Sequence, residues 1–163
     1  MTREPTLVNK VLVNKMLENK ALNVLVLLAF VLLSPLVVAD DSPQPRLPTV
    51  SFKINEVSLV AEIAATAQQR YMGLSFRKSL DANSGMLFVY PSEQRLTFTM
   101  RNTLIPLSIA FISSDLVINE IHHMDVGPNQ FFPSRMNAQY ALEVDQGWFA
   151  ANGIKPGDQL VRQ

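Results

Sequence analysis

Short segments in which apolar and polar residues alternate recur along this chain from residue 50 onward. Alternation with a period of two places the apolar side chains on one face of a strand. Turn-forming residues separate these segments about every 8–12 residues, which is the spacing of an all-β barrel or sandwich. We therefore expect a mainly β, compact barrel-like or sandwich domain of about seven or eight short strands.

Most of the expected strands show this alternation, and one segment is apolar almost throughout. That segment, Gly85–Tyr90, favours a strand that is buried on both faces. Asn55 and Glu56, which lie between the first two segments, predict a tight turn and hence a hairpin. The expected strands are 49–54, 57–64, 85–90, 96–101, 107–112, 116–124, 140–144 and 159–162.

Two short helices are expected between the strands. Thr66 and Gln69 have the spacing of a capping box, and Gly73 can end that helix in a left-handed conformation. A second short helix is expected over residues 146–153, with Gly153 at its end. Because strands and long helices do not alternate along the sequence, a doubly wound parallel fold is not expected.

An uncharged apolar run, Val24–Ala39, lies between a basic leader and two aspartates. This order of charge, apolar core and small residue predicts a secretory signal over residues 1–39. Met16 is an alternative start that would give a signal of ordinary length. A spanning helix needs about 20 apolar residues, and this run of sixteen is shorter. We therefore expect export to the periplasm, with an uncleaved inner-membrane anchor as the alternative.

The remainder of the chain reads as a linker followed by a domain. Residues 40–48 contain three prolines and little to bury, which predicts an extended linker before a single β-rich domain over 49–163.

The lack of cysteine excludes disulfides, thiol catalysis and thiolate metal sites. From Asp40 onward the chain has ten Lys and Arg residues and twelve Asp and Glu residues, a net charge of −2. This charge gives no electrostatic support for nucleic-acid binding. We expect neither a cofactor nor a bound metal ion.

Several short motifs follow one another along the domain in a characteristic order. They begin with a glutamate after an apolar strand and end with a Gly-Asp pair. In sequence order they are Glu62; Gly73-Leu74 followed by Arg77; Gly85-Met86-Leu87-Phe88; Phe98, Met100, Asn102 and Thr103; Leu142-Glu143 followed by Gly147; and Gly157-Asp158.

This order of motifs resembles the bacterial and archaeal family catalogued as domain of unknown function 192 (DUF192). The resemblance runs from about residue 57 to residue 160 and implies a small, mostly β, barrel-like domain that is often exported. It implies no reaction. Two residues depart from the family's pattern: Thr99 replaces an aromatic residue, and Ser108 replaces an aspartate. An activity that needs that aspartate is therefore not expected of this chain.

Arg101, Asn102 and Thr103 interrupt the alternation between two strands with three adjacent hydrogen-bonding side chains. One interpretation is structural, because Asn and Thr side chains stabilise turns by bonding the nearby main chain. The other is a binding site that also includes Arg77 and Glu143, since arginine presents a planar fork of donors to carboxylates and phosphates.

Glu62 and Glu143 each lie opposite the apolar set of a strand. If the two carboxyl groups face each other, they can act as the acid and base of a hydrolase. Solvated strand faces give the same pattern without any chemistry.

Two further features invite a functional reading. His122 and His123 suggest a metal site, but neighbours on a strand point to opposite faces and do not readily share an ion. Phe131 and Phe132 in the loop 127–136 suggest a protein-interaction module if their rings are exposed.

We therefore expect an exported binding domain whose ligand is a small polar or anionic molecule or a component of the cell envelope. The carboxylate-dependent hydrolase and the protein-interaction module are the alternatives, and the sequence does not decide whether the protein is an enzyme. The expected binding residues are Arg77, Arg101, Asn102, Thr103 and Glu143, with Glu62 as the second choice.

Overall fold

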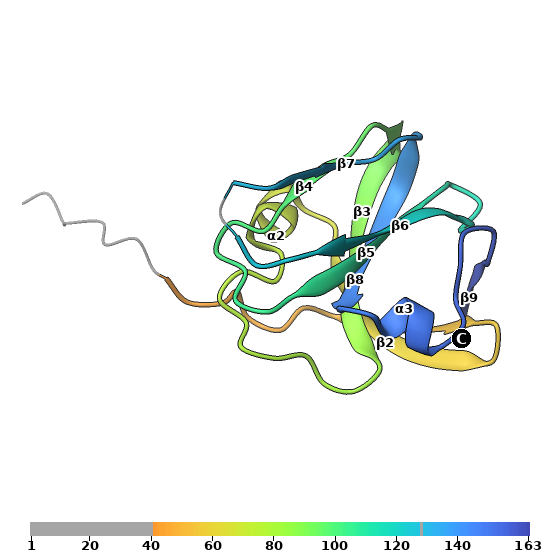
Figure 1. Cartoon of the computed structure of the whole chain (residues 1–163), viewed down its shortest axis with the longest axis horizontal. Coiled ribbons are helices and arrows are strands. Elements are labelled where there is room, and N and C mark those ends of the chain that lie inside the picture. The colour runs from red at the N-terminus through yellow and green to blue at the C-terminus, as the bar shows by residue number, and fades with distance from the viewer. Residues whose placement is uncertain (1–40, 128) are drawn as a thin grey trace, which may run out of the picture. The chain divides into compact units, whose positions relative to one another are not determined.

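The computed structural model describes residues 41–127 and 129–163, and this part of the chain contains nine strands and two short helices (Figure 1). The prediction of a mainly β domain with two short helices is confirmed. The expected signal over 1–39 and the alternative start at Met16 lie outside the described residues. In chain order the elements are β1 (Thr49–Ile54), β2 (Val57–Ala64), α2 (Ala67–Met72), β3 (Ser84–Gln94), β4 (Thr97–Thr99), β5 (Leu107–Ile112), β6 (Ile118–Met124), β7 (Phe131–Pro133), β8 (Ala138–Asp145), α3 (Trp148–Ala151) and β9 (Leu160–Arg162).

Seven of these strands form one curled sheet in the order β6-β5-β8-β3-β2-β1-β9, which resembles half a barrel (Figure 1). Its neighbours are antiparallel except for β2 and β3, which run parallel. A parallel pair needs a crossover, and here α2 and the loop after it make that connection. Strands β4 and β7 pair separately as a small second sheet. Strand β7 lies inside the segment that the sequence indicated as one long loop.

Local chemistry explains the hairpin and the first helix. Asn55 has φ of 53°, a left-handed conformation that asparagine tolerates, and β1 pairs with β2 directly beyond it. Thr66 accepts a hydrogen bond from the Gln69 amide while the Gln69 side chain bonds back to the amide of Thr66, so the predicted capping box is present. Gly73 ends the helix at φ of 49°.

Both faces of the sheet are covered by apolar side chains. Alternate residues of β3 enter two different apolar cores, one on each face of the sheet. The first core contains Leu87, and the second core contains Phe88. The second core continues through Phe98 of β4, whose ring meets Phe88 edge to face with centroids 4.9 Å apart. The set of strand residues that includes Glu62 and Glu143 therefore faces a core and not solvent.

The segment expected to be a linker is extended but docked on the domain. Pro48 accepts a hydrogen bond from the Ile63 amide (2.9 Å), and the Leu47 side chain packs against the second core. The Gln44 side-chain amide donates to the main-chain carbonyls of Gly73 (2.8 Å) and Gln69 (3.1 Å). Within the described ranges, no helix is long and apolar enough to span a membrane.

We predict that Gly85→Ala destabilises the protein by about 1–3 kcal/mol, because the backbones of β3 and β8 approach closely at this position. A Cβ on Gly85 would lie 2.3 Å from the carbonyl oxygen of Glu143 and 2.9 Å from a methyl group of Val144. Urea denaturation measures the change in the free energy of unfolding. Ser84→Ala, one residue earlier, is the control and should cost less than Gly85→Ala; equal stabilities of Gly85→Ala and the natural protein would contradict the prediction.

Candidate binding pocket

A pocket with a volume of about 210 Å³ lies between α2 with its following turn, strand β4, and the second face of the large sheet. Its residues come from four separate segments, so only the folded chain brings them together. The lining consists of residues 70–75, Phe88, Tyr90, residues 97–99, Arg101, Thr103 and Glu143.

Glu143 supplies the buried end of this pocket. It lies in β8 between Met86 of β3 and Ile109 of β5, and only 5% of its surface is exposed. No described residue donates a hydrogen bond to its carboxyl group. Burial raises the pKa of Glu143 to about 8, so this side chain is mainly protonated and uncharged at neutral pH. In that form it can both donate and accept a hydrogen bond.

Two arginines line the pocket in different ways. Arg101 is exposed, and its guanidinium lies 4.8 Å from the ring centre of Tyr71 without a polar partner among the described residues. Arg70 lies over the ring of Tyr90 at 4.7 Å, and its Nη1 donates to the main-chain carbonyls of Ala65 and Val89. Arg70 is thus held by the fold, whereas the donors of Arg101 are available to a ligand.

Residues with hydroxyl groups also line the pocket. Thr103 is buried, and the Thr99 hydroxyl accepts the amide hydrogen bond of Arg101 at 3.0 Å, which fixes the main chain of that arginine. Burial raises the pKa of Tyr90, Arg70 opposes that shift and Glu143 adds to it, so the phenol stays protonated. The pocket therefore offers several neutral hydrogen-bonding groups and one available cation.

Asn102 has a structural role in the turn and does not line the pocket. It adopts φ of 59°, and its carbonyl accepts a hydrogen bond from the Phe76 amide at 2.8 Å. The triplet of polar residues thus divides: Asn102 makes the bend, while Arg101 and Thr103 on either side of it line the pocket. The structural interpretation therefore fits Asn102, whereas the binding interpretation of Arg101 and Thr103 stays a prediction.

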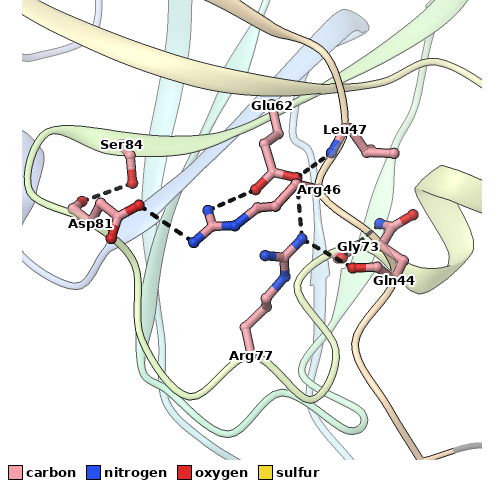
Figure 2. A network of polar contacts seen from close by, with 8 residues as sticks. All are labelled: Gln44, Arg46, Leu47, Glu62, Gly73, Arg77, Asp81 and Ser84. Carbon is pink, nitrogen blue, oxygen red and sulfur yellow. Dashed lines mark hydrogen bonds and ion pairs between the residues drawn. The ribbon is translucent and has the colours of Figure 1, made fainter.

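Glu62 and Arg77 form an ion pair with each other outside the pocket lining (Figure 2). The distance from Arg77 Nη2 to Glu62 Oε2 is 3.1 Å, and both side chains are buried. Arg46 pairs with Oε1 of Glu62 at 3.1 Å, and the Leu47 amide donates a hydrogen bond to Oε2 at 2.8 Å. Arg77 also donates to the carbonyl of Gln44 at 3.2 Å. This network fastens the segment before β1 to the sheet.

The two glutamates of the proposed hydrolase do not share a cleft. They face the same side of the sheet, but Glu62 pairs with Met86, which in turn pairs with Glu143. Two strand spacings, about 10 Å, therefore separate their backbones. The Glu62 carboxylate is bonded to Arg46 and Arg77, so it is not placed to exchange a proton with a ligand near Glu143.

Sequence reasoning missed the pocket residues that come from α2, β3 and the start of β4. Arg70 and Tyr71 were placed on a short helix and Tyr90 in an apolar run, with nothing to connect them. A usable signal was the polar side of β4, where Thr97 and Thr99 alternate with the apolar residues that enter the core. Thr99 lies two residues before Arg101, and both threonines line the pocket with that arginine.

Residues 50–162 match the DUF192 family, whose description is "Uncharacterized ACR". The chain belongs to the DUF192 family. Among solved structures it is similar to a protein from Sinorhizobium meliloti 1021 described as a "putative transcription regulator", with 28% identity, a TM-score of 0.70 and coverage of 73% of this chain and 97% of that one. It is also similar to a protein of unknown function from Novosphingobium aromaticivorans DSM 12444, with 28% identity, a TM-score of 0.65 and coverage of 78% and 99%. No curated protein matches the chain.

The two departures from the DUF192 pattern have different consequences. Ser108 is fully buried; its hydroxyl accepts a hydrogen bond from the Gly147 amide at 3.0 Å and lies 3.1 Å from Nδ1 of His123. It therefore links β5 to the start of α3. Thr99 lines the pocket, and a larger aromatic side chain at this position would occupy part of its volume.

The remaining sequence candidates do not line the pocket. His122 contacts Glu120 at 2.7 Å, whereas the neighbouring His123 points to the other face of β6 toward Ser108. No cluster of metal-ligating side chains occurs within residues 41–127 and 129–163. In the loop 127–136, Phe131 is 71% exposed, but Phe132 packs against the second core.

We predict that Arg77→Met destabilises the domain by about 3 kcal/mol, because it leaves part of the buried Glu62 charge without its partner. The double variant Glu62→Gln with Arg77→Met should recover stability, since it also removes that charge. Urea denaturation at neutral pH tests both. Lys53→Met breaks the exposed Lys53–Glu56 pair (2.7 Å) and is the control, with an expected loss below about 1 kcal/mol. A loss for Arg77→Met no greater than the control's would refute the prediction.

We predict that Glu143 makes the natural protein less stable as pH rises from about 5 to 8. Its pKa in the folded state, about 8, exceeds the ordinary value of 4.5, so the folded state retains a proton that the unfolded chain has released. This contribution to stability is fully present below pH 4.5 and is lost through pH 8, with a slope of up to about 1.4 kcal/mol per pH unit.

Glu143→Gln removes the titrating group and should flatten this part of the profile. Denaturation of both proteins at a series of pH values between 5 and 9 gives the difference between their free energies of unfolding. That difference isolates Glu143 from the other titrating groups. If the two profiles are parallel, Glu143 does not titrate as described.

Proposed function

We propose that this DUF192 protein is an exported binding domain that holds a small polar or anionic molecule in the pocket between α2, β4 and Glu143. The observation that carries the proposal is the buried Glu143 carboxyl, which lines the pocket and has no hydrogen-bond partner among the described residues. Because Glu143 lines the pocket, a polar group of a ligand there can supply the hydrogen bond that the described residues do not.

The charge distribution of the pocket favours an anion at its exposed end. The Arg101 guanidinium is free to form two parallel hydrogen bonds with a carboxylate, and it is already oriented by its position over Tyr71. Arg70 also lines the pocket and adds a second positive charge. Glu143 does not oppose an anion at neutral pH, because it is mainly protonated there.

Export is the second part of the proposal and follows from the predicted signal over residues 1–39. In the periplasm the domain would meet small nutrients and fragments of the cell envelope. An inner-membrane anchor is the alternative for this segment. Sequencing the N-terminus of the protein isolated from cells distinguishes them, since cleavage after Ala39 leaves a protein that begins at Asp40.

The alternative functions have less support. A hydrolase based on Glu62 and Glu143 needs a shared cleft, and Glu62 is bonded elsewhere. A protein-interaction module would rest on Phe131, a single exposed ring. The Sinorhizobium neighbour is described as a "putative transcription regulator", but for this chain the net charge of −2 from Asp40 onward gives nucleic-acid binding no electrostatic support.

We predict that the protein purified natively from the cell envelope retains a small molecule, and that native mass spectrometry detects it as an added mass. Arg101→Ala should reduce the bound fraction strongly, because a lost charged hydrogen bond lowers affinity about 10-fold or more. Thr99→Trp should do the same by filling the pocket. Arg162→Ala, an exposed arginine on β9, is the control and should bind as the natural protein does.

Circular dichroism of each variant separates a lost ligand from a lost fold. The proposal fails if the natural protein carries no added mass and binds no small carboxylate in titrations. It also fails if Arg101→Ala and Thr99→Trp retain as much of the ligand as Arg162→Ala.

A further inference from the structure

We infer that the pocket selects a small monocarboxylate whose far end carries an uncharged hydrogen-bonding group, such as a hydroxyl or an amide. This inference rests on the proposed binding function and narrows it to one class of ligand. Three features of the pocket support it: the different partners of its two arginines, the buried carboxyl at its inner end, and its volume.

The outer end is suited to one carboxylate. Arg101 and Arg70 are the two arginines of the lining, and they differ in what their donors already bind. Arg70 is held by the carbonyls of Ala65 and Val89 and lies flat on Tyr90. Arg101 has an open guanidinium, whose fork geometry matches the two oxygens of a carboxylate. A carboxylate therefore docks at the exposed end of the pocket.

The inner end is suited to an uncharged group. A second anion there would be buried beside the Glu143 carboxyl, which would be unfavourable as soon as that carboxyl loses its proton. An ammonium group would require Glu143 to ionise in a place where burial opposes charge, and both ions would lose their hydration. A hydroxyl or amide avoids both costs, because it can accept from and donate to a protonated carboxyl.

The apolar part of the lining and the volume limit the ligand's size and character. Phe88 and Phe98 line the pocket together with its polar residues, so a short chain of methylene groups can pack against their rings. A cavity of about 150 Å³ holds a molecule the size of benzene, and this pocket has about 210 Å³. A carboxylate of about four or five carbons that carries one terminal polar group is compatible with that volume.

The test uses the natively exported protein, freed of any retained molecule by dialysis, and two matched series of carboxylates. The four-carbon series is 4-hydroxybutyrate, succinamate, succinate, 4-aminobutyrate and butyrate, and the five-carbon series has the same end groups. Isothermal titration at pH 7 gives each affinity. We expect the hydroxyl or amide compound to bind at least about 10-fold more tightly than the dianion, the aminated compound and the unsubstituted acid of the same length.

Variants of Glu143 separate recognition from a merely structural role. Glu143→Gln keeps an uncharged donor and acceptor, so the preference for the hydroxyl or amide compound should persist. Glu143→Leu removes both functions and should reduce that preference while the unsubstituted acid still binds. Arg101→Ala should weaken every carboxylate in the series.

The outcomes distinguish this inference from the proposed function. Tightest binding of the dianion or of the aminated compound overturns the inference but leaves a carboxylate-binding pocket in place. An unchanged preference in Glu143→Leu also overturns it. If the natural protein, with no molecule retained, binds none of these compounds, the inference fails together with the anion site at Arg101.

Discussion

Burial of both faces of the seven-stranded sheet is the constraint on which the rest of this structure depends. In the central part of the sheet, along β5, β8 and the first half of β3, a residue on either face enters an apolar core, so a polar side chain there must have a partner or become uncharged. Glu62 forms ion pairs with Arg77 and Arg46, and the Ser108 hydroxyl accepts a hydrogen bond from the Gly147 amide. Glu143 has the same surroundings but no partner, and its raised pKa is the result.

The different outcomes at Glu62 and Glu143 separate structure from function within one row of the sheet. The two residues are aligned across β2, β3 and β8, and they are almost equally buried. The Glu62 carboxylate contributes to the fold because its bonds join three distant parts of the chain. The Glu143 carboxyl is left free by the fold, and it borders a volume that a ligand can fill. The proposed ligand would therefore bind where folding leaves hydrogen-bonding capacity unused.

Local features of the sequence predicted local structure well. The turn at Asn55 and the capping box of Thr66 and Gln69 act over a few residues, and both occur as expected. The polar strand residues were harder to interpret, because alternation alone does not reveal whether the second face of a sheet meets solvent or a second core. That face is covered by β4 and β7, and their pairing joins residues more than thirty positions apart, such as Phe98 and Phe132.

The docked segment before β1 has a practical meaning for where this domain begins. The family match starts at residue 50, yet Gln44, Arg46 and Leu47 make bonds that belong to the folded unit. A recombinant protein trimmed to the family boundary would lose a guanidinium and an amide from the Glu62 carboxylate. It would also lose the hydrogen bonds from the Gln44 side chain to the end of α2, which forms one wall of the candidate pocket. Cloning boundaries for related proteins are better chosen from the contacts of this segment before β1 than from sequence similarity.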